Sequence, residues 1–331
     1  MILEQLDTLL RNEAAALPPA NPWRASAMGH CIRKGCFEEL GVKPEPMQSR
    51  RMLVLKQGSS IHDDLLTPLL KKALGWRLVD GKDFGDTFVE IDGAKIGYHI
   101  DFAFQHTIID TLGNETTNGI GVAEIKSMSD YAFNRALNGE IEKPYLCQAW
   151  VYKEATDFNP VVFICYRKET SHMLEIVFDR NATEVIVTKT LTGNPLELAK
   201  HDPITLTTIS SPFDDSVGDY VRERIKYLKL TKLITPPYGV DWLINEVPGA
   251  DAVEDEVEKV QGKKAALEKL NQYTDAAGHA PIPQQNGSWY TFNTGRAILG
   301  FPCGGYCGFM KICFPTAQME LKGDKPVWVI P

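Results

Sequence analysis

Apolar residues recur at helical spacing through most of the first 75 positions of the chain. Three stretches of this kind cover residues 2–16, 26–40 and 48–74. Ser26 is a candidate N-cap for the second stretch, and Pro68 predicts a kink in the third. The pattern therefore predicts three helices before the first strand.

Beyond residue 88 the apolar positions alternate, which is typical of strands. The dipeptide Asp92-Gly93 separates two alternating runs and predicts a tight hairpin turn. We expect strands over 89–91, 96–104, 121–126, 160–167 and 172–179, with helices over 129–138 and 142–156. This order predicts an α/β fold in which helices flank a mixed central sheet.

Residues 180–300 follow a less regular pattern. They contain a predicted helix over 214–231, a charged predicted helix over 251–272, and connections rich in Pro, Gly and Asn. The region is either a small second domain or an extension around the first. We divide the chain into an N-terminal helix (1–25), a core (26–180), an additional helical or irregular region (181–300) and a C-terminal cysteine-rich segment (301–331).

Composition and charge narrow the class of protein only a little. The chain has 331 residues, of which 44% are hydrophobic and 24% charged, as in ordinary globular proteins. The net charge of −8 argues against a surface coated with positive charge for wrapping nucleic acid. An enzyme that meets phosphate through a local basic groove stays compatible with this balance.

The chain shows no sign of membrane insertion or export. It contains no run of eighteen apolar residues, and its first residues lack the basic-then-apolar order of a signal peptide. We therefore expect a cytoplasmic location, or the host cytoplasm if the chain is phage-encoded. Seven cysteines, an odd number, in such a compartment favour metal or redox chemistry over a disulfide framework.

The most informative short motif is Glu124-Ile125-Lys126 on a predicted strand. Side chains two positions apart share one face of a strand, so Glu124 and Lys126 project together. If the strand carrying Asp101 is its neighbour, two carboxylates lie beside an ammonium group. Hard ions such as Mg²⁺ or Mn²⁺ prefer oxygen ligands of this kind, and a lysine there can orient or deprotonate a bound water. Alone, however, such a Glu–Lys pair is usually a solvated ion pair.

Other residues in a definite order strengthen the case for a site. His62 lies on the long predicted helix and can add a nitrogen ligand, although a helical histidine is more often a surface residue. Gln148 and Tyr152 are four apart and share one face of a predicted helix, which ordinary aromatic packing also explains. The prediction of a site therefore depends on the ordered set rather than on any one residue.

This ordered set runs from Gly58-x-x-x-His62 through a strand Asp and E-x-K to Q-x-x-x-Y. It resembles the RecB-like branch of the PD-(D/E)XK nuclease superfamily. The resemblance spans about residues 26–180 and implies the mixed-sheet core of that family. It implies that three residues bind the catalytic Mg²⁺ or Mn²⁺, that a lysine assists the water, and that two residues line the site near DNA. In this order they are His62, Asp101 and Glu124, then Lys126, then Gln148 and Tyr152. The loop between Asp101 and Glu124 is longer than is usual in the family.

The cysteines provide a second signal. Cys303, Cys307 and Cys313 have the spacing C-x₃-C-x₅-C, typical of soft ligands that wrap one metal, and a tetrahedral site needs a fourth ligand. The sequence around Cys31 resembles family members that carry a 4Fe–4S cluster, which implies that Cys31 is this fourth ligand. Cys36 is the competing candidate. Because the family spacing is C-x₂-C-x₅-C, zinc or an altered cluster remains an alternative.

The remaining cysteines have a simpler interpretation. Cys147 and Cys165 lie in apolar surroundings within predicted elements, so we expect both to fill the core. A cluster that joins Cys31 to Cys303 would close a very long loop and would act mainly as a structural staple between the N- and C-terminal segments.

Candidate DNA contacts lie next to these motifs. Arg33 and Lys34 follow the first cluster cysteine, and Arg51 precedes His62 on its helix. Tyr131 follows the E-x-K strand, where its ring could stack on a base of single-stranded DNA.

The resemblance implies a metal-dependent exonuclease that hydrolyses single-stranded DNA or DNA ends in recombination, repair or phage DNA processing. CRISPR-adaptation nucleases share these features, so a nuclease of that kind is an alternative, and recombination or CRISPR-adaptation proteins are the expected partners. One alternative is a DNA-end-binding module that uses an iron–sulfur scaffold and has little catalysis. An oxidoreductase is disfavoured, because no glycine-rich dinucleotide fingerprint follows a predicted strand.

Overall fold

The chain forms two compact units in the computed structural model. The first comprises Met1–Val42 and Pro46–Gly239, and the second comprises Lys43–Glu45 and Val240–Pro331. The four-segment division predicted from the sequence stays a prediction. The structure describes residues 2–85, 87–109, 115–180, 185–190, 206–209, 213, 215–233, 247, 253–261, 282–283, 289–299, 307, 309–313, 317–322 and 325–330.

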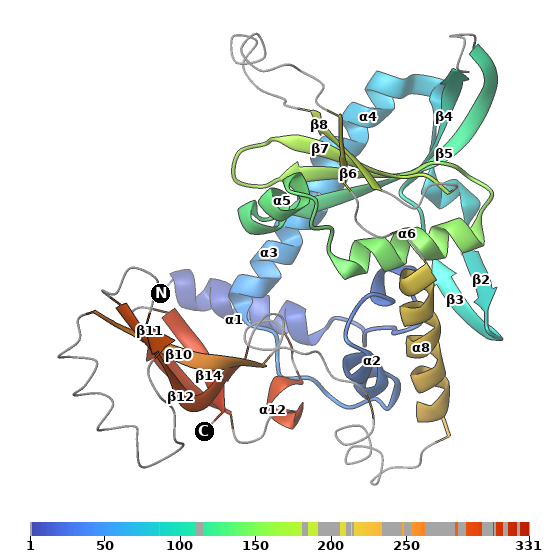
Figure 1. Cartoon of the computed structure of the whole chain (residues 1–331). Helices are drawn as coiled ribbons and strands as arrows, with labels where there is room; N and C mark the ends of the chain where they lie inside the picture. The colour runs from blue at the N-terminus through green and yellow to red at the C-terminus, as the bar shows by residue number, and fades with distance from the viewer. Residues whose placement is uncertain are drawn as a thin grey trace. The chain divides into compact units, whose positions relative to one another are not determined.

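The first unit contains a seven-stranded mixed sheet (Figure 1). Its strand order is β1-β4-β5-β6-β7-β8-β9, and only β5 and β6 among these neighbours run parallel. A parallel pair needs a crossover connection, here built by two helices, α5 (Asp130–Leu137) and α6 (Lys143–Ala155). The predicted α/β architecture is therefore confirmed. The strands are β1 (Leu78–Asp80), β4 (Phe102–Ile109), β5 (Glu115–Met128), β6 (Val161–Arg167), β7 (Met173–Phe178), β8 (Val185–Thr190) and β9 (Leu206–Ile209).

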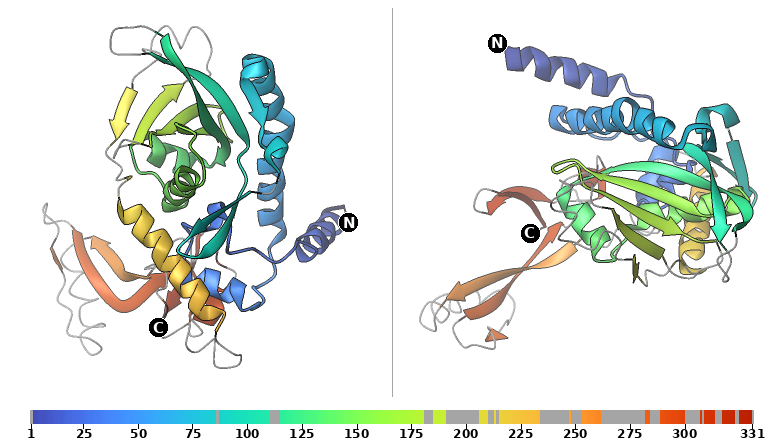
Figure 2. Two further views of the ribbon diagram at one scale, coloured as in Figure 1. Left: turned by 90° about the vertical axis from the view of Figure 1, so that its right-hand side faces the viewer. Right: turned by 90° about the horizontal axis from the view of Figure 1, so that it is seen from above.

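Helices cover both faces of this sheet (Figures 1 and 2). On one face, residues of the segment that leads into α4 (Thr67–Leu74) pack against Phe102, Ala123 and Ile125 of the sheet. On the other face lie α5 and α6. Helix α8 (Asp215–Thr231) packs against α6 and α2 (Ile32–Glu39). The helix predicted over 214–231 is thus confirmed as α8.

The first three predicted helices differ from the structure in detail. Helix α1 (Ile2–Ala15) is as expected. Over 26–40, however, Ser26 belongs to a short 3₁₀ turn, and α2 begins only after Cys31, which is its N-cap. Tight packing accounts for the difference, because an added Cβ at Gly29 would lie 2.3 Å from the Cα of Pro144. The backbone that approaches α6 here is not helical.

The long helical pattern over 48–74 is divided by a π-helical segment. It runs as α3 (Ser49–Ser60), the π segment η2 (Ile61–Leu66) and α4. The N–H of Thr67 bonds to the carbonyl of His62 in the π pattern. Pro68 lies at the start of α4, where its missing N–H costs little, so the irregularity expected at Pro68 falls in the preceding turns.

The first predicted hairpin forms a separate two-stranded sheet. Strands β2 (Thr87–Ile91) and β3 (Ala94–Tyr98) pair around Asp92-Gly93, whose φ angles of 49° and 71° suit a tight hairpin turn. The strand predicted over 96–104 is therefore wrong as one element, because β3 ends at Tyr98 and β4 begins at Phe102. At the break the backbone carbonyls bind other segments, since that of His99 accepts the hydroxyl of Tyr152 and that of Asp101 accepts the N–H of Gly81.

The second unit contains an antiparallel sheet of its own. Its strand order is β10-β12-β14-β13, with β11 paired to β12. The helix predicted over 251–272 is wrong for 253–261, which forms β10, while the rest of that range lies outside the described residues. Val253, Val257 and Val260 also fit helical spacing, but pairing with β12 decides the structure. The elements are β10 (Val253–Gln261), β11 (Ile282–Pro283), β12 (Trp289–Leu299), α12 (Met310–Cys313), β13 (Gln318–Lys322) and β14 (Lys325–Ile330).

None of the helices in the described part of the chain combines the length and the apolar character that crossing a membrane requires.

Candidate active site

The E-x-K motif lies on β5, in the middle of the seven-stranded sheet. As the spacing predicts, its residues alternate between faces. Ile125 is buried in the cluster under η2 and α4, whereas Glu124 and Lys126 face α6. Phe163 of β6 pairs with Glu124 in parallel register, and its ring centroid lies 5.4 Å from Nζ of Lys126. The motif is therefore enclosed on the α6 side of the sheet.

Asp101 stands where β4 separates from β5. Because β4 begins at Phe102 opposite Ala123, the N–H of Ile125 has no strand partner in β4. Oδ2 of Asp101 accepts this N–H at 2.7 Å and lies 3.0 Å from Nε2 of His62. Asp101 thus occupies a bend just before β4 rather than the strand that the sequence predicts. The β4–β5 register, extended by one residue beyond Phe102 and Ala123, would place Asp101 opposite Glu124.

His62 reaches this carboxylate from the π-helical segment η2. Its other ring nitrogen, Nδ1, lies 2.8 Å from Oδ1 of Asp63. The hydrogen bond to Asp101 is the main cause that raises the pKa of His62 to about 9, and burial opposes it. The contact with Asp101 therefore favours the protonated form of this ring while no cation is bound.

Lys126 and Gln148 bind the same oxygen of Glu124. Nζ of Lys126 donates to Oε1 of Glu124 at 2.8 Å and to Oε1 of Gln148 at 3.0 Å. Nε2 of Gln148 donates to the same Glu124 oxygen at 2.9 Å. Glu124 is 7% exposed and Gln148 only 4%, so these contacts form in a medium that screens charge poorly.

Tyr152 completes the network from one turn farther along α6. Its Oη accepts a hydrogen bond from Nε2 of Gln148 at 2.7 Å, and lies 2.6 Å from the carbonyl O of His99 and 3.0 Å from Oε2 of Glu124. The hydroxyl has one proton and can donate to only one of the last two oxygens at a time. Burial, and then the charge of Glu124, raise the pKa of Tyr152 well above its usual value.

All six residues of the predicted motif set therefore meet in one region. Two groups form, His62 with Asp101 and a four-residue group on the α6 side, and the Asp101–Ile125 hydrogen bond links them. The first group is the more open, since 31% of the His62 side chain is exposed. The arrangement can hold protons, orient a water and present carboxylate oxygens to a cation.

No preformed metal site is present among the described residues. As placed in this part of the chain, no three His, Cys, Asp or Glu side chains are grouped to hold one ion. In the structure both oxygens of Glu124 have protein donors or a hydroxyl beside them, and His62 binds Asp101 directly. The metal-ligand roles of His62, Asp101 and Glu124 thus stay predictions.

The four predicted DNA contacts lie on three different helices. Arg33 and Lys34 are on α2, Arg51 on α3 and Tyr131 on α5. Nζ of Lys34 lies 3.7 Å from Glu38, so its charge is partly balanced, whereas Tyr131 is 68% exposed. Their contact with DNA stays a prediction.

The cysteines divide into core and candidate ligands. Cys147 and Cys165 are fully buried, which confirms the core interpretation, and burial raises the pKa of Cys147 to about 12. Cys31 in the first unit and Cys307 and Cys313 in the second are partly exposed. Cys303 lies outside the described residues.

Three contributors to the site could not be identified from the sequence. The backbone carbonyl of His99 holds the Tyr152 hydroxyl, and a backbone group leaves no side-chain signature. The rings of Phe163 and Tyr145 flank Lys126, with centroids 5.4 and 5.9 Å from its Nζ. Both were visible only as apolar positions of a predicted strand and helix.

Comparisons with known proteins add little to this description. No family model matches the sequence, and no curated protein matches it. Among solved structures, the chain is similar to the crystal structure of SSO0001, with a TM-score of 0.36 and 16% identity, over 73% of this chain and 93% of that one. It is also similar to an alkaline exonuclease (LHK-Exo) from Laribacter hongkongensis, with a TM-score of 0.29 and 12% identity, over 70% of this chain and 96% of that one. Likeness at this level assigns no function.

Proposed function

We propose that this chain is a metal-dependent nuclease that hydrolyses phosphodiester bonds of single-stranded DNA or DNA ends, as an exonuclease of recombination, repair or phage DNA processing. One observation carries the proposal. Residues from η2, the start of β4, β5 and α6, which are up to 90 positions apart in the sequence, join in one network of two carboxylates, an imidazole and an ammonium group. An ordinary surface ion pair forms without buried polar neighbours. Here the buried Gln148 and the buried Tyr152 both contact Glu124.

The donor set fits a hard divalent ion such as Mg²⁺ or Mn²⁺. Asp101, in the bend before β4, and Glu124, on β5, supply carboxylates, and His62 supplies an imidazole. When bound, the ion supplies a Lewis acid for the phosphoryl group and a water of lowered pKa. His62, Asp101 and Glu124 would hold it.

Other side chains of the site then orient the attacking water and the carboxylate of Glu124. Nζ of Lys126, between Glu124 and Gln148, holds a proton next to the carboxylate and can orient the attacking water. Gln148 and Tyr152 contact the two oxygens of Glu124 and so keep that carboxylate in one orientation. Because Tyr152 is fully buried, orienting Glu124 is the role that its contacts support.

A thiolate-bound 4Fe–4S cluster, held by Cys31, Cys303, Cys307 and Cys313, is part of the proposal, with zinc as the alternative metal. A buried cation beside Cys31 supports it. Arg224 is fully buried, donates from Nη1 to the carbonyl of Cys31 at 2.7 Å, and its Nε and Nη2 have no hydrogen-bond partner among the described residues. An anionic cluster would compensate such a charge.

The same region distinguishes the two candidate first ligands. Cys36 is enclosed, and burial raises the pKa of its thiol, which disfavours the thiolate that metals bind. Cys31 is partly exposed at the N-cap of α2. Cys31 is therefore the better ligand.

Cleavage of end-labelled single-stranded DNA tests the nuclease. Protein purified without oxygen is incubated with Mn²⁺ or with EDTA, using substrates labelled at the 5′ or the 3′ end. We expect metal-dependent digestion, and a loss of at least about 100-fold in rate for Lys126→Ala, the range of general acid–base effects. Lys72→Ala on α4, an exposed lysine, is the matched control and should retain the wild-type rate.

Two results would contradict the assignment. Digestion by Lys126→Ala at the control rate would remove the lysine from the mechanism. Binding of DNA ends by folded, metal-loaded protein without any cleavage would favour the DNA-end-binding module instead.

A further inference from the structure

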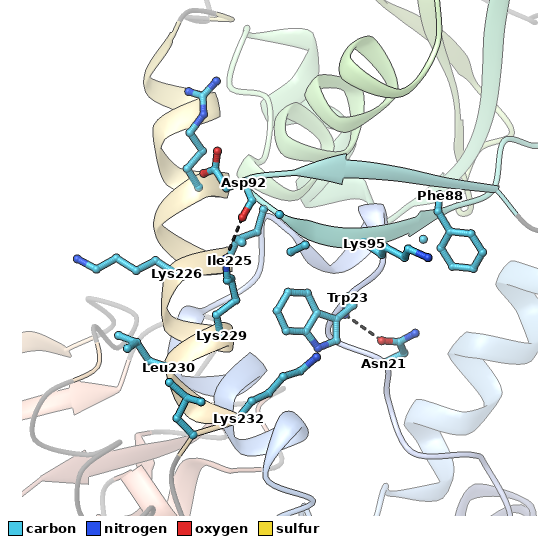
Figure 3. A pocket seen from close by; sticks show the side chains of 15 residues that line it. Asn21, Trp23, Phe88, Asp92, Lys95, Ile225, Lys226, Lys229, Leu230 and Lys232 are labelled. Carbon is cyan, nitrogen blue, oxygen red and sulfur yellow. Dashed lines mark hydrogen bonds between the residues drawn. The ribbon is translucent and has the colours of Figure 1, made fainter.

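A pocket of about 880 Å³ lies outside the candidate active site (Figure 3). Its walls are the β2–β3 hairpin, the segment with Asn21 and Trp23, and α8 from Arg222 onwards together with Lys232 and Leu233, which follow it. We call it the basic pocket. All of these walls belong to the first unit.

The pocket concentrates positive charge in a protein whose net charge is −8. Among the described residues that line it are five cationic side chains and one carboxylate, that of Asp92. Two of the cations also have a carboxylate nearby, Asp219 at 3.5 Å from Arg222 and Glu39 at 3.7 Å from Lys232, so Lys95, Lys226 and Lys229 carry most of the excess charge. A concave surface lined by one sign of charge focuses the field and raises the local concentration of a polyanion. The cations are Lys95, Arg222, Lys226, Lys229 and Lys232.

The cations are spread along a line rather than gathered at one point. Arg222, Lys226 and Lys229 follow the i, i+4, i+7 spacing of one helix face. From Arg222 to Lys232 the chain advances by about 15 Å at the helical rise. A single phosphate needs only one or two of these groups, so the line fits a ligand with several successive charges.

Two aromatic rings accompany this line of charges. Phe88 on β2 is 63% exposed although its ring is large and apolar. Trp23 lines the pocket near Lys232, whose Nζ lies 4.3 Å from the indole centroid (Figure 3). Bases of a single strand stack on such rings while cations hold its backbone.

Hydrogen bonds hold the pocket walls together. Nζ of Lys229 donates to the carbonyl of Asp92 at 2.9 Å and so ties α8 to the hairpin turn (Figure 3). The N–H of Gly97 donates to the carbonyl of Trp23 at 2.8 Å and ties the hairpin to the N-terminal segment. The pocket is therefore a built feature of the first unit.

The elements that form the pocket also support the candidate active site. Strand β3 leads directly to His99, whose carbonyl contacts Tyr152, and then to Asp101. Helix α8 packs through Gly218 against Trp150 of α6, the helix that carries Gln148 and Tyr152.

We propose that the basic pocket binds a single strand of DNA, with its phosphates on the cations of α8 and β3 and its bases against Phe88 and Trp23. That this strand is the substrate rests on the proposed nuclease function. Charge complementarity and the length of the cationic line favour a strand over a mononucleotide, and the aromatic rings favour it over an acidic peptide.

Binding of fluorescent oligo-dT, measured by anisotropy in EDTA over a range of salt concentrations, tests this site without cleavage. For Lys95→Gln/Lys226→Gln we expect roughly twentyfold weaker binding near 0.1 M salt, and a log–log salt slope reduced by about 1.4, or about 0.7 for each lost phosphate contact. Phe88→Ala should weaken binding at least about fivefold through lost stacking but keep the slope. Phe88 is exposed, so this variant is expected to fold.

The double variant Lys72→Gln/Lys82→Gln is the matched control, since both lysines are exposed and neither lines the pocket. It should bind as the wild type does. Equal binding by the pocket variants, no binding by the wild type, or displacement of oligo-dT as readily by dTMP or polyglutamate as by unlabelled oligo-dT would each overturn the proposal.

Failure of the two proposals is distinguishable. Cleavage that depends on Lys126, with oligo-dT binding unaffected by the pocket variants, would reject the pocket alone. The opposite result is weaker oligo-dT binding and a smaller salt slope in the pocket variants, but no cleavage with any metal. It would reject the nuclease and leave the pocket as a DNA-binding site.

Discussion

Tyr152 illustrates how single residues determine the candidate site. Its hydroxyl has one proton and three neighbours, namely the amide of Gln148, a carboxylate oxygen of Glu124 and the carbonyl of His99. Each of these groups is buried or partly buried, so any that loses its partner remains desolvated. Precise placement of Glu124 therefore depends on a residue that a sequence shows only as an aromatic on a helix.

Removing that hydroxyl should destabilise the fold as well as the site. For Tyr152→Phe we expect the free energy of unfolding to fall by about 1–2 kcal/mol, because buried polar partners lose a hydrogen bond. Urea unfolding measures it. The matched control is Tyr166→Phe, which removes an exposed hydrogen bond to Ser171 and should cost less than about 0.5 kcal/mol. Equal losses in the two variants would show that the hydrogen bonds of the buried hydroxyl stabilise the fold no more than an exposed hydrogen bond does.

His30 should make stability depend on pH. Burial, with the nearby charges of Lys34 and Arg224, lowers its pKa to about 4 in the folded chain, whereas the unfolded value is 6.5. Between these values the unfolded state binds a proton that the folded state does not, so stability falls as the pH drops from 6.5 towards 4. From pH 7 to pH 5 the wild type should lose about 2 kcal/mol more than His30→Gln. Urea unfolding of both proteins at the two pH values measures the difference, and parallel losses would contradict it.

At the scale of elements, packing of α8 against α6 is close at one glycine. A Cβ added to Gly218 would lie 2.9 Å from the ring of Trp150, which is itself 6% exposed and has little room to move. The distance between α8 and α6 thus depends on the absence of a side chain at Gly218. Because α8 forms one wall of the basic pocket, the position of that wall depends on it too.

Gly218→Ala should therefore destabilise the protein. Overpacking costs about 1–3 kcal/mol, which exceeds the gain in helix propensity of at most about 1 kcal/mol. We expect a net loss of about 1 kcal/mol in urea unfolding. Glu223→Ala, on the exposed face of the same helix, is the control and should change stability by less than about 0.5 kcal/mol. A stabilised Gly218→Ala protein would show that the ring relaxes freely.

Whether a segment forms a helix or a strand was predictable where a local pattern decides it. The prediction failed where pairing with another strand decides it. The helices around 2–15 and 215–231 and the Asp92-Gly93 turn follow from periodicity and turn chemistry. The strand β10 did not, because its valines satisfy helical spacing while its pairing with β12 comes from a distant segment. Strands β8 and β9 were not predicted, because they lie in the region after residue 180 where the pattern is less regular.

For the whole molecule, the distribution of charge matters more than its sum. The net charge of −8 coexists with the basic pocket and with Arg224, a buried cation with unpartnered N–H groups among the described residues. Buried charges are costly unless compensated. The cluster that we propose would supply such compensation next to Cys31.

Loss of a cluster ligand should remove iron and stability together. Cys307→Ala, purified without oxygen, should contain less iron per chain and should melt at a lower temperature than the wild type. Cys165→Ala is the control, since this buried core cysteine should cost stability but leave the iron content unchanged. An iron-replete, brown Cys307→Ala protein would remove Cys307 from the ligand set.

The sequence by itself determined the local features of this protein. Strand alternation placed Glu124 and Lys126 on one face, and helical spacing placed Gln148 and Tyr152 together, because backbone geometry alone sets these relations. Tertiary structure decided the rest. The parallel pairing of β5 with β6, the bond from Asp101 to Ile125, and the basic pocket each join segments far apart in the chain. Such contacts depend on which distant faces pack and which backbone groups remain unpaired, and no local pattern records that.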